Sequence, residues 1–164
     1  MTHITLRYPA ELLRDWKLGR VHRKWYRQDT ATFCERDLQN AERQCCKGYH
    51  FGEWLAVRHF RKLGYEVLPP KYLHPTRVRA VKKATKILGK PVVAFLMQKR
   101  RFGAKFRKSP RPDLLVFRSN PKTFFFVEVK RDADRLSSSQ RQFFPMIEKK
   151  LGCEVRIVSV KALA

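Results

Sequence analysis

The alternation of apolar and polar residues in the C-terminal half of the chain predicts a β-hairpin. Apolar runs cover residues 114–117 and 123–130, and the turn-forming sequence Ser-Asn-Pro-Lys at 119–122 separates them. Side chains two positions apart in a strand point to the same face, so Glu128 and Lys130 share a face. Charged residues therefore close one of the most hydrophobic runs of the chain, where a buried strand would stay apolar.

The hairpin is followed by the pattern of a helix and a further strand. Ser137 and Gln140 have the spacing of a capping box, which starts a helix that runs to about Leu151. Pro145 lies inside that helix and is expected to kink it or to mark a restart. Residues 154–160 alternate as a strand does, so the second hairpin strand, the helix and this strand form a βαβ unit with parallel strands.

The N-terminal part of the chain has mainly helical periodicity. Helices are predicted over residues 9–27, with a break at Gly19, over 32–46, over 51–63 and over 76–88, with a short strand at 65–68. Residues 92–97 fit a strand or a helix equally well. We predict a helical N-terminal extension at 1–50 and an α/β domain at 51–164, interrupted by a basic insertion at 69–111.

Charge is concentrated in that insertion. The chain carries 37 Lys and Arg against 14 Asp and Glu, a formal net charge of +23. Residues 69–111 hold 14 of the basic residues and no acidic one. This excess indicates a polyanionic partner, most simply DNA or RNA. The predicted phosphate contacts are Arg77, Arg79, Lys82, Lys83, Lys86, Lys99, Arg100, Arg101, Lys105, Arg107, Lys108 and Arg111.

No apolar segment predicts a membrane span or a secretion signal, and the longest apolar run covers only residues 92–97. We therefore expect an intracellular protein, in the cytoplasm or nucleoid, and reduced thiols. The set Cys34, Cys45, Cys46 and His50 matches no structural zinc spacing, so ordinary thiols are favoured over a zinc site.

A register that places Asp113 opposite Glu128 would bring two carboxylates and the ammonium of Lys130 to one end of the sheet. Such a set suits Mg²⁺ or Mn²⁺, with the backbone carbonyl of Val129 as a further oxygen ligand. Lys130 would position or deprotonate a water and offset charge on a scissile phosphate. Glu53 would bind a second metal, directly or through water.

Gln140 would orient Lys130 or that water, in addition to its capping role.

Four motifs in the stretch 111–160 carry a family resemblance. They are Pro112-Asp113-Leu114, Val127-Glu128-Val129-Lys130, Asp134-Arg135-Leu136-Ser137 with Gln140, and Glu154-Val155-Arg156-Ile157-Val158. With these motifs the stretch resembles the VRR-NUC domain of the PD-(D/E)xK nuclease superfamily, so the domain at 51–164 would be a nuclease domain of this type. Residues 51–67 resemble the family's first helix, with Glu53 as its acidic residue.

The resemblance implies an α/β fold with a restriction-endonuclease-like core, in which a central mixed β-sheet is flanked by helices. It implies metal binding at Asp113, Glu128 and Val129, catalysis by Lys130, and supporting roles for two further residues, Glu53 and Gln140. Arg131 departs from the family, whose members often have a small residue after the lysine.

The expected activity is Mg²⁺- or Mn²⁺-dependent hydrolysis of phosphodiester bonds in branched or flapped DNA, with a homodimer as one arrangement that would suit four-way junctions. Two other classes stay open at this point. One is a nucleic-acid-binding protein that keeps the fold with little or no catalysis. The other is a small basic protein packed on structural RNA, which would leave the acidic pair unexplained.

Overall fold

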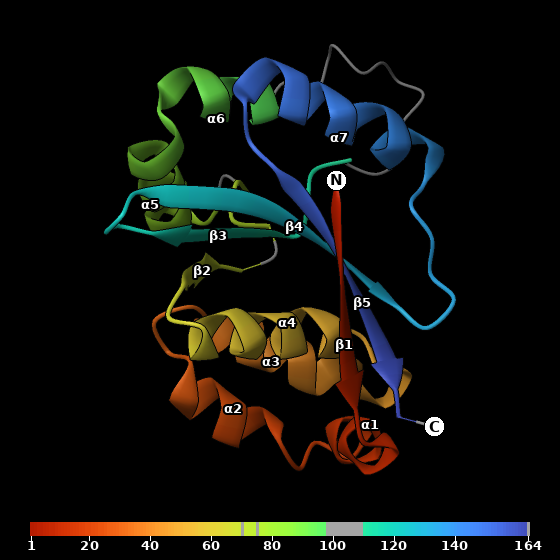
Figure 1. Cartoon of the computed structure of the whole chain (residues 1–164). Coiled ribbons are helices and arrows are strands. Elements are labelled where there is room, and N and C mark those ends of the chain that lie inside the picture. Colours follow the sequence, from red (N-terminus) through yellow and green to blue (C-terminus); the bar gives the residue numbers. More distant parts are fainter. Residues whose placement is uncertain (70, 75, 98–109, 164) are drawn as a thin grey trace.

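A computed structural model describes residues 1–69, 71–74, 76–97 and 110–163 of the 164-residue chain. Its described part has three layers, with a mixed sheet between two groups of helices (Figure 1). Helices α1 to α4 lie on one side of the sheet and helices α5 to α7 lie on the other (Figure 1). This architecture confirms the predicted α/β class with a helix-flanked mixed sheet.

Along the chain, one strand and three helices come before the elements of the predicted domain at 51–164. In order, the elements are β1 (Thr2–Tyr8), α1 (Ala10–Lys17), α2 (His22–Gln28), α3 (Glu35–Gln44), the 3₁₀ turn η1 (Cys45–Lys47), α4 (Phe51–Lys62), β2 (Glu66–Leu68), α5 (Val78–Leu88), α6 (Lys90–Met97), β3 (Leu114–Arg118), β4 (Thr123–Arg131), α7 (Ser138–Leu151) and β5 (Val155–Ala162).

The five strands are arranged in the order β1-β5-β4-β3-β2. β2, β3 and β4 pair antiparallel, while β4 pairs parallel with β5 and β5 pairs parallel with β1. The predicted hairpin and the βαβ unit are therefore confirmed. Strand β1 was not predicted, although Ile4, Leu6 and Tyr8 alternate with Thr5 and Arg7 in the manner of a strand. The N-terminal segment thus contributes a strand to the sheet as well as helices, and the domain division at residue 50 stays a prediction.

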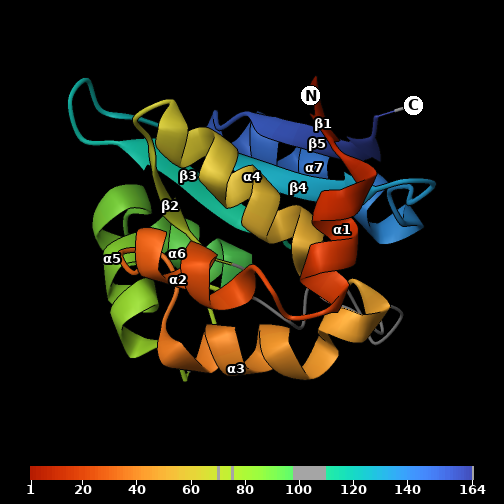
Figure 2. The same ribbon diagram turned by 90° about the horizontal axis from the view of Figure 1, so that it is seen from below.

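Helices α1 to α4 bury a cluster rich in aromatic rings against one face of the sheet. Trp16, which is fully buried, contacts the rings of Trp25, Phe51 and Trp54 at centroid distances of 5.5–5.8 Å. Figure 2, which views the molecule from below, shows α4 lying along the sheet with α1, α2 and α3 outside it. Offset and edge-on aromatic pairs of this kind add to the stabilisation from burial alone. The N-terminal helices are therefore part of the core, not a detached arm.

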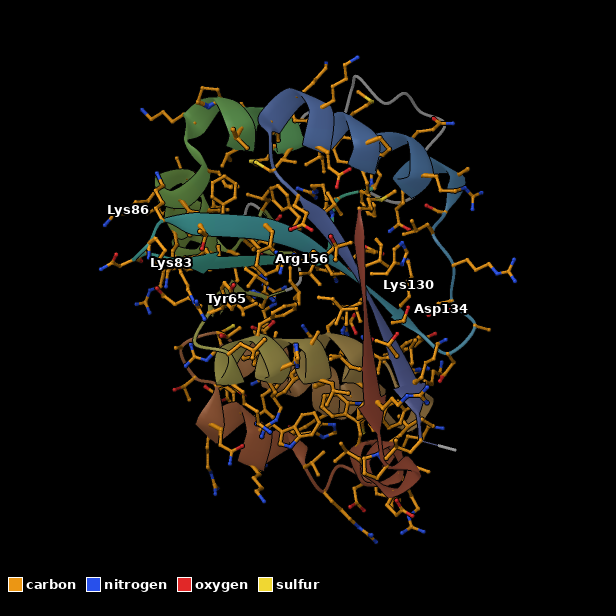
Figure 3. All side chains as sticks on the ribbon, viewed as in Figure 1. Tyr65, Lys83, Lys86, Lys130, Asp134 and Arg156 are labelled. Atoms are coloured by element: carbon orange, nitrogen blue, oxygen red, sulfur yellow. The ribbon has the colours of Figure 1, made fainter. Side chains whose placement is uncertain are left out.

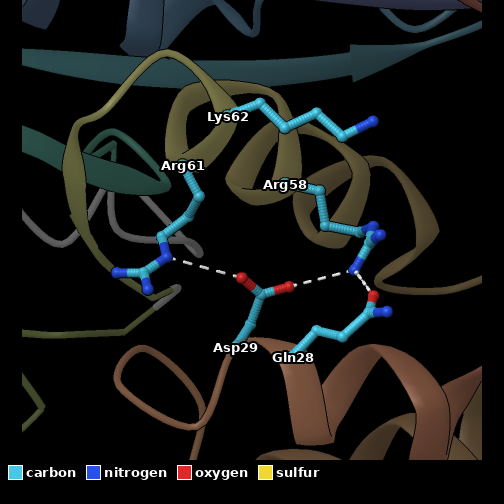
Figure 4. A pocket seen from close by; sticks show the side chains of 5 residues that line it. All are labelled: Gln28, Asp29, Arg58, Arg61 and Lys62. Atoms are coloured by element: carbon cyan, nitrogen blue, oxygen red, sulfur yellow. Dashed lines mark hydrogen bonds and ion pairs between the residues drawn. The ribbon is translucent and has the colours of Figure 1, made fainter.

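One buried carboxylate fastens this outer helical layer to α4. Asp29 is 4% exposed and follows the last residue of α2. Its Oδ2 lies 3.2 Å from Nη1 of Arg58, and its Oδ1 lies 3.5 Å from Nε of Arg61 (Figure 4). Arg58 also donates to the side chain of Gln28 at 2.7 Å. Both carboxylate oxygens are engaged, so this cluster has a complete structural explanation.

The opposite face of the sheet packs against α5, α6 and α7. Phe143, Phe144 and Ile147 of α7 are buried there, while Pro145 is exposed. Of the two outcomes expected for Pro145, a restart of the helix does not occur, because α7 is continuous through this residue. The proline is on the solvent side, where water can hydrate the carbonyl that has lost its partner.

Several local predictions are settled by the same packing. Gly19, with φ +75°, separates α1 from α2 as expected. Residues 90–97 form a helix, so the undecided segment is α6. Among the apolar residues at helical spacing in α5, Ala84 and Leu88 face the core, whereas Val78 is exposed. Leu63, which follows the last residue of α4, is exposed as well.

Candidate active site

The register of the hairpin places the two predicted carboxylates opposite each other. The β3–β4 ladder pairs Leu114 with Val127. One step further along the same register, Asp113 stands opposite Glu128. Oδ2 of Asp113 accepts a hydrogen bond of 2.9 Å from the backbone N–H of Val129. The expected register is therefore confirmed, and it fixes Asp113 at the end of the sheet beside β4.

Glu128 is the most buried charged residue of the described chain, at 2% exposure. Its Oε1 accepts from Nε2 of Gln140 at 2.6 Å and lies 2.7 Å from Nζ of Lys130. Its Oε2 is buried and has no hydrogen-bond partner among the described residues. A buried carboxylate oxygen without a partner carries a large desolvation cost, so its retention calls for an explanation.

Helix α7 supplies the amide that connects these charges. The Oε1 of Gln140 accepts from Nζ of Lys130 at 3.1 Å and from the backbone N–H of Ser137 at 3.0 Å. The backbone N–H of Gln140 donates to Oγ of Ser137 at 3.2 Å, which completes the predicted capping box. One side chain thus starts the helix and bridges Lys130 to Glu128, so the two roles considered for Gln140 are compatible.

Glu53 reaches the same end of the sheet from α4. A Cβ added to Gly52 would lie 3.1 Å from Cγ1 of Val129, so the missing side chain at Gly52 lets the helix approach β4 closely. Glu53 lies in the first turn of α4, with Oε1 3.8 Å from Nδ1 of His50. The helix is therefore positioned by direct contact with the strand that carries Glu128.

The carboxylates influence one another electrostatically. Burial, followed by the charges of Glu128 and Glu53, raises the pKa of Asp113 well above its usual range. Burial also raises the pKa of Glu128, against the opposing effect of Lys130. Burial acts to raise the pKa of Glu53 too, but the hydrogen bond and charge of His50 outweigh it and lower that pKa. Negative charge at this site is therefore only partly compensated by Lys130.

The acidic residues form a pair with a more distant third member. Across residues 1–69, 71–74, 76–97 and 110–163, no three His, Cys, Asp or Glu side chains are gathered closely enough to hold a metal ion. Asp113 and Glu128 still offer carboxylate oxygens, one of them unpartnered, which is the donor chemistry that Mg²⁺ and Mn²⁺ prefer. The pair fits a hard divalent cation with water completing its coordination, and Glu53 fits contact through such a water.

The predicted phosphate-contacting residues are divided among several environments. Arg77 is held by the carboxylate of Asp37, to which its Nη1 donates at 3.1 Å. Lys83 lies 2.7 Å from Oε2 of Glu66. The remaining basic side chains of α5, at positions 79, 82 and 86, are exposed. The predicted residues Lys99, Arg100, Arg101, Lys105, Arg107 and Lys108 lie outside the described residues.

The basic helix and the acidic pair are not adjacent. Figure 3 shows Lys83 and Lys86 at the opposite side of the molecule from Lys130. Arg111, two positions before Asp113, is half-buried at the acidic end. Any nucleic acid that contacts both α5 and the acidic pair therefore has to extend across the sheet.

Arg131, the last residue of β4, lies next to Lys130 and was assigned no role from the sequence. Its Nη1 donates to the carbonyl of Gly48, and its Nε donates to Oδ2 of Asp132 at 3.1 Å. A charged residue directly after Lys130 was the available signal, but its partner is 83 residues earlier in the chain. Only the folded chain shows which backbone group the guanidinium reaches.

None of the helices in the described part of the chain combines the length and the apolar character needed to cross a lipid bilayer. A search of curated proteins found no relative that matches the chain. The model of the VRR-NUC domain family matches residues 55–162. This match covers most of the chain, including β2 to β5, α7 and the acidic pair. The matched residues begin two positions after Glu53. Since the match covers more than half of the chain, the chain belongs to the VRR-NUC domain family and has a nuclease-type function.

Proposed function

We propose that the protein is a Mg²⁺- or Mn²⁺-dependent deoxyribonuclease that hydrolyses phosphodiester bonds, with a preference for branched or flapped DNA. Asp113 and Glu128 would hold the cation, with the carbonyl of Val129 as a further ligand and Glu53 acting through water. Lys130 would be the catalytic cation, and Gln140 would orient it.

The observation that carries this proposal is the asymmetric environment of Glu128. One carboxylate oxygen is fixed by Lys130 and Gln140, and the other is buried without a partner. A structural ion pair would engage both oxygens, because an unsatisfied buried acceptor costs about 1–3 kcal/mol. A bound divalent cation would satisfy the free oxygen and would offset the mutual repulsion of Glu128 and Asp113.

The protein side chains have separable tasks in this reaction. When bound, the cation polarises the scissile phosphate and lowers the pKa of a coordinated water. Lys130, held by Gln140 at 3.1 Å, keeps an ammonium beside the position where phosphate charge develops. The N–H of Val129 holds one oxygen of Asp113 at 2.9 Å and leaves the other for the cation. The rigid β4–α7 contact thus fixes each group before substrate arrives.

The DNA would also contact residues outside the acidic site. The exposed cations Arg79, Lys82 and Lys86 of α5 would hold phosphates of the DNA at a distance from the acidic pair, since Lys86 lies at the opposite side of the molecule from Lys130 (Figure 3). Arg77 is left out of this surface because Asp37 neutralises it. Two separated contact regions suit a DNA that has a junction between two arms, which supports the preference for branched over plain linear substrates.

The test is cleavage of labelled four-way junction, flap, single-stranded and linear duplex DNA with Mg²⁺, Mn²⁺ or EDTA. Asp113→Asn is the decisive variant, because its amide oxygen still accepts from Val129 while the charge is removed. Loss of metal-assisted stabilisation predicts a fall in rate of about a hundredfold to a thousandfold.

Asp134→Asn, which removes an exposed carboxylate at the same end of the molecule, is the matched control and should cleave as the wild type does. Equal cleavage by wild type and Asp113→Asn would identify a contaminating nuclease and reject the proposal. Lys130→Ala is less informative, because it would leave the buried Glu128 without its counter-ion and would destabilise the fold.

One observation favours the second candidate, a protein that binds nucleic acid with little or no catalysis. Glu53 is not gathered with Asp113 and Glu128 into a set of three ligands within the described residues. Tight DNA binding with no cleavage in either metal would support this candidate.

A further inference from the structure

Arg131 connects strand β4 to the segment that precedes α4. Its guanidinium donates through Nη1 to the carbonyl of Gly48 and through Nε to Asp132 at 3.1 Å. The side chain is 27% exposed, so solvent only partly competes for these donors. A planar guanidinium that uses two donors in fixed directions holds its acceptors more rigidly than a lysine could.

Gly48 makes this contact sterically feasible. Its φ is +69°, a conformation that favours glycine, and it ends the η1 turn. A Cβ added to Gly48 would lie 2.6 Å from Nη1 of Arg131. The backbone conformation and the close approach of the guanidinium therefore both require a residue without a side chain at this position.

The three residues from Gly48 to His50, the 48–50 loop, are held from two sides. The carbonyl of Tyr49 accepts from Nε1 of Trp16 at 3.0 Å, and Trp16 is fully buried. His50 has a φ of +66°, and its carbonyl accepts the first helical bond of α4 from Trp54 at 3.0 Å. Contacts with β4 and α1 thus fix the point where α4 begins.

Glu53 depends on that starting point. It lies in the first turn of α4, three residues after His50, and its carboxylate is 3.8 Å from the His50 ring. Any change in the 48–50 loop therefore moves Glu53 relative to Asp113 and Glu128. Gly52 lies close to Val129, and Phe60 further along α4 packs on Phe125 of β4, so these contacts hold the helix against the strand. The 48–50 loop sets the position of its first turn, which carries Glu53.

We infer that Arg131 is a positioning residue, which acts through the 48–50 loop to hold Glu53 at the acidic site. This inference rests on the proposed function, because it gives Glu53 a part in the reaction. Arg131 has no contact with the acidic pair among its described interactions, but its charge is one of the influences that lower the pKa of Glu53. Its effect on cleavage is therefore expected to run through Glu53, and hydrogen exchange of the loop reports the positioning part of that effect.

The first test follows the loop without using activity. Amide hydrogen exchange of residues 48–54 is measured in the metal-free full chain for wild type, Arg131→Met and Arg20→Met. Loss of a charge-assisted hydrogen bond should speed exchange in this segment by about tenfold in Arg131→Met. Arg20→Met, which removes an exposed arginine paired with Asp15, should leave it unchanged. Unchanged exchange in Arg131→Met would overturn the inference.

The second test is a double-mutant cycle in single-turnover cleavage at saturating DNA. Arg131→Met should lower the rate by about tenfold in the wild-type background and should have no further effect in the Glu53→Gln background. Arg131→Lys, which keeps one donor, should retain an intermediate rate. An equal fall in both backgrounds would show that Arg131 does not act through Glu53, and would overturn the inference.

The two tests separate the inference from the proposed function. If the wild type cleaves no substrate, the proposed function fails, while hydrogen exchange still shows whether Arg131 fixes the loop. If exchange rises but the cycle is additive, the nuclease proposal stands and the positioning role fails.

Discussion

Asp29 and Glu128 are both almost fully buried, at 4% and 2% exposure, but their surroundings differ. Asp29 has an arginine on each oxygen, at 3.2 and 3.5 Å. Glu128 has Lys130 and Gln140 on one oxygen and no partner among the described residues on the other. Burial of charge alone therefore does not identify a functional site. What distinguishes Glu128 is that one of its carboxylate oxygens is buried without a partner, so the fold does not offset the free-energy cost of removing that oxygen from water.

Because their surroundings differ, replacing Asp29 and replacing Glu128 should have different consequences. The largest effect on the free energy of unfolding is expected from replacing Asp29. Asp29→Asn leaves two partly buried arginines without a counter-ion, so it should lower the free energy of unfolding by about 2–3 kcal/mol. Urea denaturation measures this loss. Asp15→Asn is the matched control, since its exposed pair with Arg20 is worth less than about 1 kcal/mol. Unaltered cleavage per folded molecule of Asp29→Asn would complete the contrast with Glu128.

Divalent cations should stabilise the site that contains Glu128. Mg²⁺ or Mn²⁺ at tens of times its dissociation constant should raise the free energy of unfolding of the wild type by about 2 kcal/mol, because binding favours the folded state. Thermal denaturation with and without cation measures the increase. Glu128→Gln should abolish it, while Asp29→Asn should keep it. A similar increase in Glu128→Gln would place the cation elsewhere.

The metal-free protein should also lose stability as the pH rises. The pKa values of Asp113 and Glu128 are raised in the folded chain, so the folded state favours their protonated forms. Their favourable contribution is present below the unfolded values near 4 and is lost as the pH rises through the folded values. Urea denaturation in EDTA across this range should show a smaller decline for Asp113→Asn. An equal decline in both proteins would contradict the raised pKa of Asp113.

The exposed cations of α5 should have the smallest effect, and only on binding. Replacing Lys82 and Lys86 by alanine removes two charges that have no acidic partner within the described residues, whereas Lys83 is engaged by Glu66. The log–log salt dependence of DNA affinity should flatten by up to about two. Lys83→Ala should flatten it less than either single change. An unchanged slope in the double variant would exclude α5 from the DNA surface.

Local sequence patterns are sufficient to predict the elements that meet at the acidic site. Alternation over the hairpin, the capping box at Ser137 and the helix that carries Glu53 follow from such patterns, and the structure confirms each of them. The register was only a condition in the sequence, because a slip of one residue would turn Glu128 and Lys130 together to the other face; the β3–β4 ladder shows that the condition is met.

Which charges find a partner depends on the folded arrangement of distant segments. Arg77, Arg79 and Lys83 look alike in an acid-free run, but Asp37 and Glu66, which neutralise two of them, are 40 and 17 residues away. Strand β1 and the Arg131–Gly48 contact likewise depend on partners more than 80 residues distant. Local periodicity reports on neighbours within a few positions, whereas the energy of a buried charge depends on groups that only folding brings near it.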